Sequence, residues 1–354
     1  HVEQFTMEKS EFDKYVNLIR TTYLDDSPEG RATIFFDEDT FHFLFGSPSI
    51  PRDNFCRVIH EATGQIVGFV GSIPRGLHYD GTIYKVTIPA WGTVHPDHQR
   101  KGLAVMMAKE FLKIGLETME YDGGIPAFEA GAHGKGAAQK FTRESGMEMQ
   151  ELVRVNKFII KILDMRKVTL VNKLKWYEKF GMKLFSGVKK VNNPRVRKME
   201  PRDHDRLYEL MDDHLKYNEL SLVRDKEDFE WYLEHPVVNC VVHEDEHGVV
   251  DGFVVAWKFN LAGFGHIVPF GWLDLVHTYR LSTKEAADMF KYLCVTSKDL
   301  GWAGIQSPFI PYFNPGPLRK ANFIFYPKVL TLGLFKLSEM PIPNKVKSFY
   351  FDFR

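Results

Sequence analysis

Residues Trp91–Met107, WGTVHPDHQRKGLAVMM, decide the fold of this chain. An extended segment runs to Val94, and Pro96 ends it because proline has no N–H to donate to a strand ladder. A short loop then leads into a helix whose apolar residues step by four, four and three, which makes one stripe: Leu103, Met107, Phe111 and Ile114. The stretch predicts a strand, a loop and a helix packed on a core.

The loop in this stretch is a candidate anion site. Gly102 falls at the helix entry, where a side chain would block the approach of a ligand. The free N–H groups of residues 101–104 would converge at the positive end of the helix dipole. Arg100 and Lys101 add positive charge beside them. These residues predict a phosphate-binding loop; the alternative is a tight turn without a ligand.

The residues Gln99–Ala104, QRKGLA, match the (Gln/Arg)-x-x-Gly-x-(Gly/Ala) signature of the GNAT superfamily of acyl-CoA-dependent N-acyltransferases, and Val94–Asp97 resembles the approach to that loop. The resemblance implies a coenzyme A pyrophosphate site that includes Gln99, Arg100, Lys101, Gly102, Leu103 and Ala104. It also implies that strand N–H groups near Thr93, Val94 and His95 bind the cofactor thioester and stabilise its oxyanion.

A second segment, Ala130–Gly146, resembles the other cofactor-binding element of that family, which usually reads Asn-x-x-Ala-x-x-Tyr. Here Lys135 stands at the Asn position and Phe141 at the Tyr position. Both are expected beside the cofactor. Phe141 has no proton to donate, so the tyrosine that often protonates the leaving thiolate in this family is missing, and water would serve instead.

The general base is not found at its usual place, because Lys85–Val94 contains no acid. Three catalytic candidates remain. His133 lies in the glycine-rich loop, and its alternative is an ordinary loop residue. Glu129 lies on the preceding strand, and its alternative is a structural role. The third is a terminal carboxylate at Arg354, since N-myristoyltransferases and some tandem-GNAT acetyltransferases use one.

An internal repeat sets the architecture. Cys56–Val70, CRVIHEATGQIVGFV, aligns with Cys240–Val254, CVVHEDEHGVVDGFV, at an offset of 184 residues with six identities. Each copy is a hairpin pattern followed by a strand, a helix and a strand. We therefore predict an α/β (α+β mixed sheet) fold of two tandem GNAT-like domains, 1–163 and 194–354, with the second degenerate. The layout resembles that of N-myristoyltransferases.

A basic linker helix is predicted over 164–193, with a helical pattern from Met165 to Gly181. Within Arg166–Lys190 eight Lys or Arg face the single acid Glu178. One interpretation is an electropositive helix near a phosphate-bearing ligand or an anionic surface. The favoured alternative is a linker whose apolar side packs on one domain while its lysines stay solvated; that side would be Leu170, Leu174 and Tyr177.

The second copy has lost the phosphate loop, because residues 276–286, VHTYRLSTKEA, contain neither the signature nor a glycine. We predict that this domain binds no coenzyme A and contributes to the acceptor site. Eight aromatic residues could line an apolar cleft towards the first domain, and the alternative is that they are core residues: Trp257, Phe259, Phe264, Phe270, Trp272, Phe309, Tyr312 and Phe313.

Composition narrows the function. The 354 residues hold 46 Lys plus Arg against 46 Asp plus Glu, which argues against nucleic acid. Three distant cysteines suit neither a metal site nor a disulfide framework, and no apolar stretch approaches the roughly 18 residues of a membrane span. We expect a cytoplasmic protein without a metal.

The expected function is transfer of an acyl group from acetyl-CoA or another acyl-CoA to a primary amine of a small molecule or peptide. Acetyl is the default donor. The alternatives are a long-chain N-acyltransferase of the N-myristoyltransferase type and a non-catalytic acyl-CoA sensor. The oligomeric state stays open.

Overall fold

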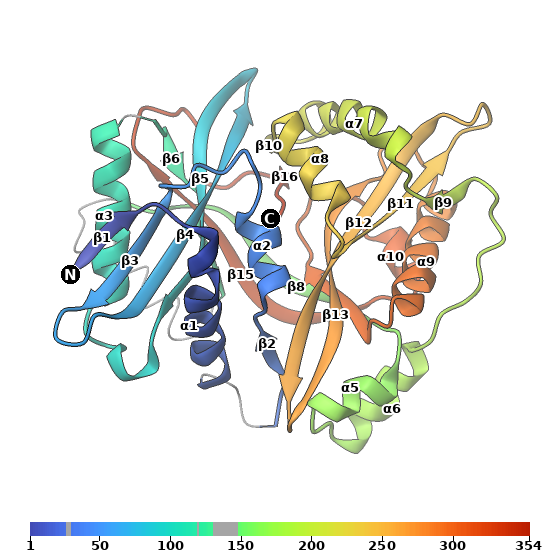
Figure 1. The fold of residues 1–354 in the computed structure, drawn as a ribbon. Helices are drawn as coiled ribbons and strands as arrows, with labels where there is room; N and C mark the ends of the chain where they lie inside the picture. Colours follow the sequence, from blue (N-terminus) through green and yellow to red (C-terminus); the bar gives the residue numbers. More distant parts are fainter. Residues whose placement is uncertain (26–29, 119, 130–147) are drawn as a thin grey trace.

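One mixed sheet runs through both halves of the molecule in a computed structural model that describes residues 1–25, 30–118, 120–129 and 148–354 (Figure 1). Its strands follow the order β1-β3-β4-β5-β6-β15-β8-β14-β13-β12-β11-β9. Helices cover the faces of this sheet in each half. The predicted α/β fold of two tandem domains is confirmed, and no described helix is long and apolar enough to span a membrane.

The first half consists of β1 (Val2–Phe5), α1 (Phe12–Asp25), β2 (Thr33–Phe35), α2 (Glu38–Phe45), β3 (Phe55–His60), β4 (Gln65–Tyr79), β5 (Thr82–Val94), α3 (Leu103–Thr118), β6 (Gly123–Gly124), β7 (Ala127–Glu129) and β8 (Gln150–Ile162). Two linker helices follow, α5 (Met165–Val171) and α6 (Trp176–Phe185). The second half consists of β9 (Val196–Lys198), α7 (His204–Tyr217), β10 (Leu220–Val223), α8 (Lys226–Glu234), β11 (Val238–Glu244), β12 (Val250–Gly263), β13 (His266–His277), α9 (Thr283–Asp299), β14 (Gly304–Pro308), α10 (Gly316–Lys320), β15 (Ile324–Lys336) and β16 (Phe349–Tyr350).

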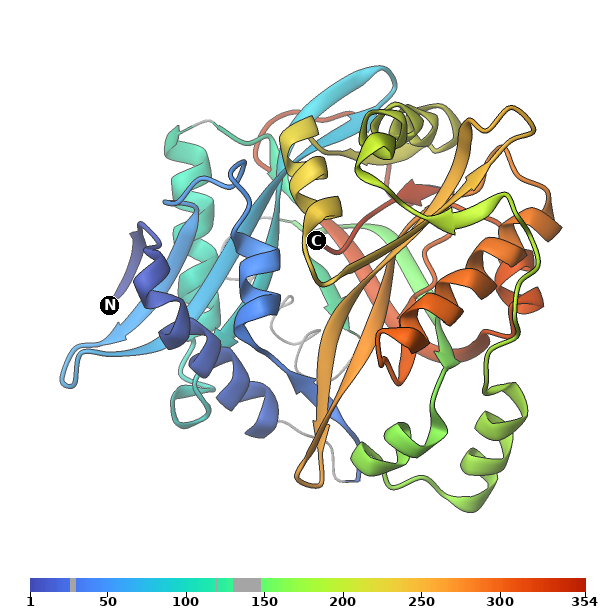
Figure 2. The same ribbon diagram turned by 45° about the vertical axis from the view of Figure 1, so that its right-hand side comes forward.

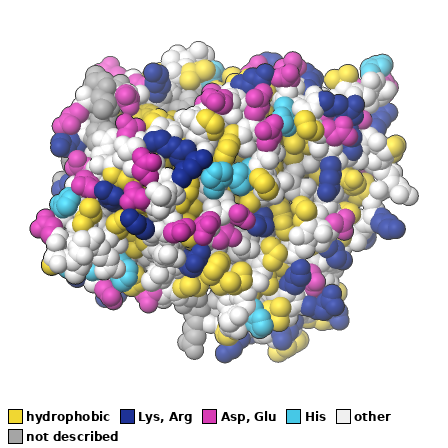
Figure 3. All heavy atoms as spheres, in the orientation of Figure 1, with side chains coloured by type: hydrophobic (Ala, Val, Ile, Leu, Met, Phe, Trp, Pro, Cys, Tyr) yellow, Lys and Arg dark blue, Asp and Glu magenta, His cyan; other side chains and the backbone are white. Residues whose placement is uncertain are grey.

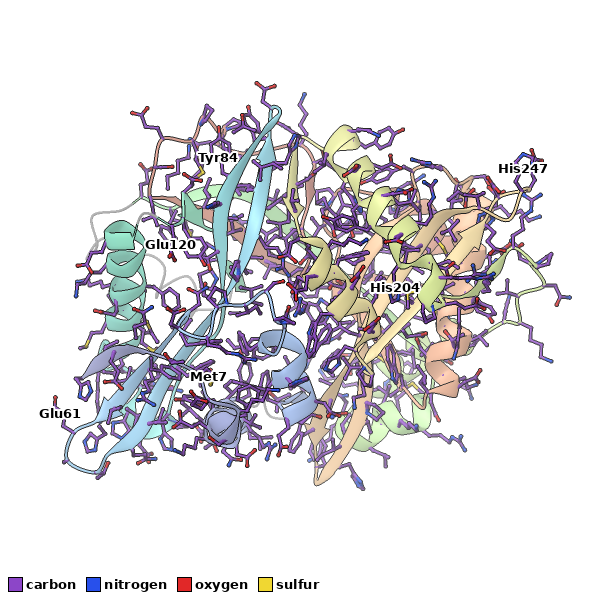
Figure 4. The ribbon with its side chains drawn as sticks, turned by 45° about the horizontal axis from the view of Figure 1, so that its top comes forward. Met7, Glu61, Tyr84, Glu120, His204 and His247 are labelled. Atoms are coloured by element: carbon purple, nitrogen blue, oxygen red, sulfur yellow. The ribbon has the colours of Figure 1, made fainter. Side chains whose placement is uncertain are left out.

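The internal repeat is present as two equivalent hairpins, β3–β4 and β11–β12. Glu61 and His247 mark their tips at opposite ends of the molecule in Figure 4. Their registers differ by one residue, since Cys56 pairs with Val70 whereas Cys240 pairs with Val255. The β-bulge skips the equivalent residue in each hairpin, Val67 in β4 and Asp251 in β12. The difference therefore arises at the turn, because the last pairs, His60 with Gln65 and Glu244 with Val250, enclose four and five residues.

The two halves exchange strands, so the sheet crosses the predicted boundaries at 163 and 194. From the first half, β2 pairs with β12. From the second, β10 pairs with β4, and β15 pairs with β6, β7 and β8. The pairing of β2 with the long β12–β13 hairpin is visible in Figure 2. The boundaries 1–163, 164–193 and 194–354 stay a prediction.

The linker differs from the single helix expected up to Gly181. It forms two helices, and α6 continues through Gly181 to Phe185. The break follows Asn172, whose side-chain oxygen accepts a hydrogen bond from the Ala32 N–H at 3.0 Å. The Lys173 N–H donates to the Gly30 oxygen at 2.9 Å instead of continuing the helix. Hydrogen bonds to Gly30 and Ala32 of the first half therefore hold residues 172 and 173 outside a helix and separate α5 from α6.

A buried ionic cluster joins the halves. It brings together Arg75 of β4, Arg224 and Asp228 beside α8, and Asp352 and Arg354 of the C-terminal segment, all less than a tenth exposed. Arg224 binds both carboxylate oxygens of Asp352, at 2.7 and 3.2 Å. Asp228 lies 3.3 Å from both Arg75 and Arg224 and also accepts a hydrogen bond from the Arg354 guanidinium.

These contacts fix the charge on Asp228. Burial alone would raise its pKa, but Arg354, Arg75 and Arg224 hold the pKa of this carboxyl well below its usual range. Each charge in the cluster depends on the others, because an unpaired ion in a protein interior is strongly unfavourable.

We expect Arg224→Leu to lower the free energy of unfolding by about 3–5 kcal/mol, because it leaves two buried carboxylates short of a partner. Arg202→Leu is the matched control, since Arg202 is 68% exposed and pairs with Glu200 at 2.7 Å. It should cost about 0–1 kcal/mol. Urea denaturation measures both, and equal losses would contradict the importance of the cluster.

Candidate active site

The predicted phosphate loop has the backbone of an anion site. The chain turns through left-handed conformations at Arg100, φ 62°, and Gly102, φ 82°, and α3 starts at Leu103. The N–H groups of Val105 and Met106 both donate to the Gly102 oxygen. The N–H groups of residues 103 and 104 lie in the first turn of α3, ahead of the first helical hydrogen bond, so they have no acceptor inside the helix.

Two side chains stabilise the loop through hydrogen bonds to main-chain oxygens. The Gln99 amide donates to the Val94 oxygen at 3.4 Å, and the Lys101 ammonium donates to the Asp97 oxygen at 2.9 Å. The exposed Arg100 keeps its charge at the loop edge. The sequence prediction for Gln99–Ala104 therefore corresponds to a preformed turn with outward N–H groups and two nearby cations.

A bulge interrupts β5 just before this loop. The pairing with β4 skips from Thr93 to Ala90, so Trp91 and Gly92 together oppose the single residue Val70. Trp91 takes a positive φ of 57°, which is strained for a bulky residue. A bulge re-aims backbone groups and is common beside active sites. The N–H groups of Trp91 and Gly92 are thus the candidate oxyanion donors.

These candidate oxyanion donors begin two residues before the N–H groups near Thr93, Val94 and His95 that were predicted from the sequence. Thr93 and Val94 lie opposite Phe69 and Gly68 in the regular ladder. The His95 N–H donates to the Val67 oxygen at 2.9 Å, so it is not available to a ligand. The bulge is a property of strand pairing and cannot be read from the residue types alone.

The strands part next to the bulge. β5 pairs with β6 only at Val86 and Thr87, and the following strand β7 pairs with β15 instead. From Ile88 to the bulge, this edge of β5 has no strand partner among the described residues. An open edge with free backbone groups can bind an extended amide-containing chain such as pantetheine.

Four of the predicted site residues are not placed in full. His133, Lys135 and Phe141 lie outside the described residues. The backbone of Glu129 pairs with Leu330 in the sheet, but its side chain is not described. Their roles stay predictions.

Arg354 lies at the centre of the molecule and is fully buried. Its main-chain oxygen accepts hydrogen bonds from the guanidinium groups of Arg75 and Arg224, the latter at 2.5 Å. Its side chain donates to the Phe43 oxygen at 2.9 Å. Two guanidinium donors favour an anionic oxygen and oppose its protonation. The role of a terminal carboxylate as base stays a prediction.

A small cavity of about 10 Å³, room for about one water molecule, lies between the C-terminal segment and β13. Its wall is mostly apolar and includes Ile310, Tyr312, Phe313, Phe351 and Phe353. Asp274 is the one charged residue in that wall. A single buried carboxylate in an apolar wall is able to accept a hydrogen bond or a proton from a donor beside it.

The pKa of Asp274 is shifted towards neutral pH. Burial, and next the neighbouring Asp352 carboxylate, raise the pKa of Asp274 to about 6. Its two oxygens accept hydrogen bonds from the Tyr232 hydroxyl at 2.9 Å and the Phe353 N–H at 2.7 Å. Each oxygen keeps a second lone pair, so the group is able to accept a proton from a bound amine.

Sequence analysis missed Asp274. The available signal was a lone acid in the apolar strand His266–His277, HIVPFGWLDLVH. A carboxylate at a core position is either paired or functional, and the sequence pattern does not show which. Only the packing of β13 against the C-terminal segment brings Asp274 to a cavity.

The eight predicted cleft aromatics divide into groups. Tyr312 and Phe313 line the cavity. Three are core residues less than a twentieth exposed: Trp257, Phe259 and Phe270. Trp272 and Phe309 are partly buried and pack against the core. Phe264 is exposed on the β12–β13 hairpin. Most of the set are therefore core residues, as the alternative stated.

The second domain has no equivalent anion site at α9. The Ser282 hydroxyl accepts the Glu285 N–H at 3.3 Å, and the Glu285 carboxylate accepts the Ser282 N–H at 2.9 Å. This capping box uses the helix donors and adds a negative charge where a pyrophosphate would bind. That the second domain binds no coenzyme A stays a prediction.

Comparison with known proteins supports the same class. Residues 5–125 match the acetyltransferase (GNAT) domain family. The crystal structure of Saccharomyces cerevisiae N-myristoyltransferase with bound myristoyl-CoA superposes with a TM-score of 0.78 at 16% identity, over 99% of this chain and 85% of that one. No group of three metal ligands occurs within the described ranges.

Two curated relatives are glycylpeptide N-tetradecanoyltransferases. The Plasmodium falciparum protein is 20% identical over 255 residues, 70% of this chain and 57% of its own length. The Drosophila melanogaster protein is 22% identical over 237 residues, 65% of this chain and 46% of its own length. The chain thus spans about half the length of these relatives.

Residues 5–125 therefore resemble an acetyltransferase (GNAT) domain. The chain as a whole has the two-domain GNAT fold of N-myristoyltransferases.

We expect Gly102→Leu to weaken coenzyme A binding at least about tenfold, because a side chain at the helix entry blocks the phosphate and φ 82° disfavours it. Gly64→Leu is the matched control, with φ 67° and open space around it. Both variants should lose about 1–2 kcal/mol of stability. Calorimetric titration with coenzyme A measures the difference, and equal affinities would contradict the loop assignment.

Proposed function

We propose that this chain is a long-chain acyl-CoA N-acyltransferase that acylates the amino terminus of a peptide. The observation that carries the proposal is the parted edge of β5, with a bulge at Trp91–Gly92 followed directly by the phosphate loop. This geometry suits a thioester on an extended arm with its phosphates anchored. The tetradecanoyl and myristoyl transferases among its relatives favour a long acyl group over acetyl.

In the proposed reaction, the peptide amine attacks the thioester carbonyl carbon. The C–N bond forms as the carbonyl becomes an oxyanion, which accepts hydrogen bonds from the Trp91 and Gly92 N–H groups. The C–S bond then breaks, and the coenzyme A thiolate takes a proton from water, which suffices at a thiol pKa of about 8.5. Residues 101–104 hold the pyrophosphate throughout.

The amine must lose a proton, and we propose Asp274 as its acceptor. The carboxylate lies in the wall of an apolar cavity, and its pKa of about 6 leaves it mostly ionised at neutral pH yet basic enough to take a proton. The alternative base at Arg354 would have to act while its main-chain oxygen binds two arginines.

The function is tested by incubating the protein with acetyl-CoA or myristoyl-CoA and a peptide that has a free amino-terminal glycine. Release of coenzyme A is measured, and the acylated peptide is identified by mass spectrometry. Faster turnover with myristoyl-CoA, lost when the peptide amine is blocked, is the expected result. Faster acetyl transfer would overturn the chain-length assignment, and binding without turnover would favour an acyl-CoA sensor.

We expect the ratio kcat/KM to rise with pH through about 6, because Asp274 accepts a proton only after it ionises. Asp274→Asn should lower kcat by about 10²–10⁴ and remove that inflection. Myristoyl-CoA affinity serves as the control and should stay unchanged. A retained inflection in Asp274→Asn would move the base to another residue.

The same shift predicts a stability effect in the wild type. The folded pKa is raised, so Asp274 stays protonated in the folded state while it ionises in the unfolded state above about pH 4. The contribution of Asp274 to stability is therefore full below pH 4 and falls as pH rises to 6, by about 3 kcal/mol. Urea denaturation across this range should show that fall in the difference between the wild type and Asp274→Asn, since other titrating groups are common to both.

A further inference from the structure

Helix α6 exposes large apolar side chains on one face. Trp176 is 80% exposed, Phe180 61% and Leu184 64%. They are spaced four residues apart, so they form a stripe along one side of the helix. Exposed aromatic and aliphatic residues of this size are unusual on a protein surface unless something covers them.

A second stripe of lysines runs beside the first. Lys175, Lys179 and Lys183 each precede one of the apolar residues, which places the charges along one edge of the apolar face. Lys179 and Lys183 make no ion pair within the described part of the chain. Such a helix has an apolar face flanked by unneutralised positive charge.

Neighbouring elements extend this surface. Leu170 of α5 is 43% exposed, and at the β12–β13 tip Phe264 is 47% and Ile267 52% exposed. The Lys173 ammonium lies 4.8 Å from the centre of the Phe264 ring, which joins the hairpin to the linker. Figure 3 shows hydrophobic and Lys or Arg side chains side by side at the lower right, over α5, α6 and this tip.

A lysine-lined cavity of about 20 Å³, with room for one or two water molecules, lies beside the segment that follows α6. Its wall includes Lys161, Lys189, Lys291 and Lys320 and no acid. Lys161 is only 3% exposed, and its ammonium donates to the main-chain oxygen of Phe185, the last residue of α6, at 2.7 Å. These lysines add positive charge beside the helix, although Lys291 is paired with Asp288 at 3.0 Å.

The favoured sequence interpretation of the linker is wrong in part, because the apolar residues that the linker buries in the core are Val168 and Val171 of α5. Leu170 and Tyr177, expected to pack on a domain, are 43% and 51% exposed, and of the three expected residues only Leu174 packs on the core. The chain leaves the apolar side of α6 in solvent, although burying it would stabilise the protein. A partner that is both apolar and anionic matches the two stripes together.

We propose that α5, α6, the 263–267 hairpin tip and the adjoining lysine cavity bind the surface of an anionic phospholipid bilayer. Trp, Phe and Leu insert at the boundary between headgroups and acyl chains, while the lysines contact lipid phosphates. A second copy of the chain fits worse, because a symmetric contact would bring the two lysine stripes together. A bilayer also explains the apolar stripe, which nucleic acid would leave exposed.

The experiment is flotation of the full chain with vesicles. We expect binding to vesicles of phosphatidylcholine with 30% phosphatidylserine, little binding to phosphatidylcholine alone, and loss of binding in 0.5 M salt. Absence from the anionic vesicles at low salt would overturn the proposal. Binding that inositol hexakisphosphate removes, with no dependence on Trp176 or Phe180, would also overturn it in favour of a free-phosphate site.

Two variants separate the contributions. Lys179→Glu/Lys183→Glu should reduce vesicle partitioning by at least about thirtyfold, the effect of two removed charges. Trp176→Ser/Phe180→Ser should reduce it by at least about tenfold while keeping the charge. Wild-type partitioning in both variants would overturn the proposal.

The matched controls lie at the other end of the molecule. Lys85→Glu/Lys347→Glu makes the same charge change, and Ile83→Ser removes an apolar side chain that is 55% exposed near the β4–β5 tip, beside Tyr84 in Figure 4. Both should partition as the wild type. Sedimentation velocity completes the test, because a dimer that Trp176→Ser/Phe180→Ser abolishes would assign this face to self-association instead.

Discussion

The buried ionic cluster of Arg75, Arg224, Arg354, Asp228 and Asp352 is the constraint on which the rest of the molecule depends. Charges that are less than a tenth exposed persist only when each is paired. Here the partners come from β4, from the region of α8 and from the C-terminal segment, so pairing requires all three to meet. The same contacts place the C-terminal segment against β13, where it forms one wall of the cavity that contains Asp274.

Helix α2 connects this cluster to the cofactor side. Just before the helix, the Phe36 ring lies 4.6 Å from Trp91 at the bulge of β5. Near its end, Phe43 accepts a hydrogen bond from Arg354 and packs against Tyr232 and Trp257 of the second half. α2 thus lies between the halves (Figures 1 and 2). Residues of both halves therefore pack around α2.

The local parts of this site were predictable because short-range chemistry sets them. Gly102 before an amphipathic helix specifies a turn with free N–H groups, and the structure contains that turn. Features that depend on neighbouring strands were not predictable. The bulge at Trp91 arises from the register against β4, and the break at Asn172 arises from a contact with Ala32, 140 residues away. The exposure of Trp176 and Phe180 likewise escaped the sequence, because a helical apolar stripe has the same pattern whether it is buried or not.

By itself, the sequence determined the fold class, the repeat and the turn at Gly102 before α3, since hydrophobic periodicity, glycine at a special φ and proline at a strand end are local constraints. Only the tertiary structure decided which groups meet. It joined Asp274, Phe351 and Phe353 at one cavity, although nearly 80 residues separate them along the chain. It also left α6 uncovered while burying three arginines. The physical reason is that burial and charge pairing are properties of long-range packing, and a linear pattern records which residues could be buried without recording what covers them.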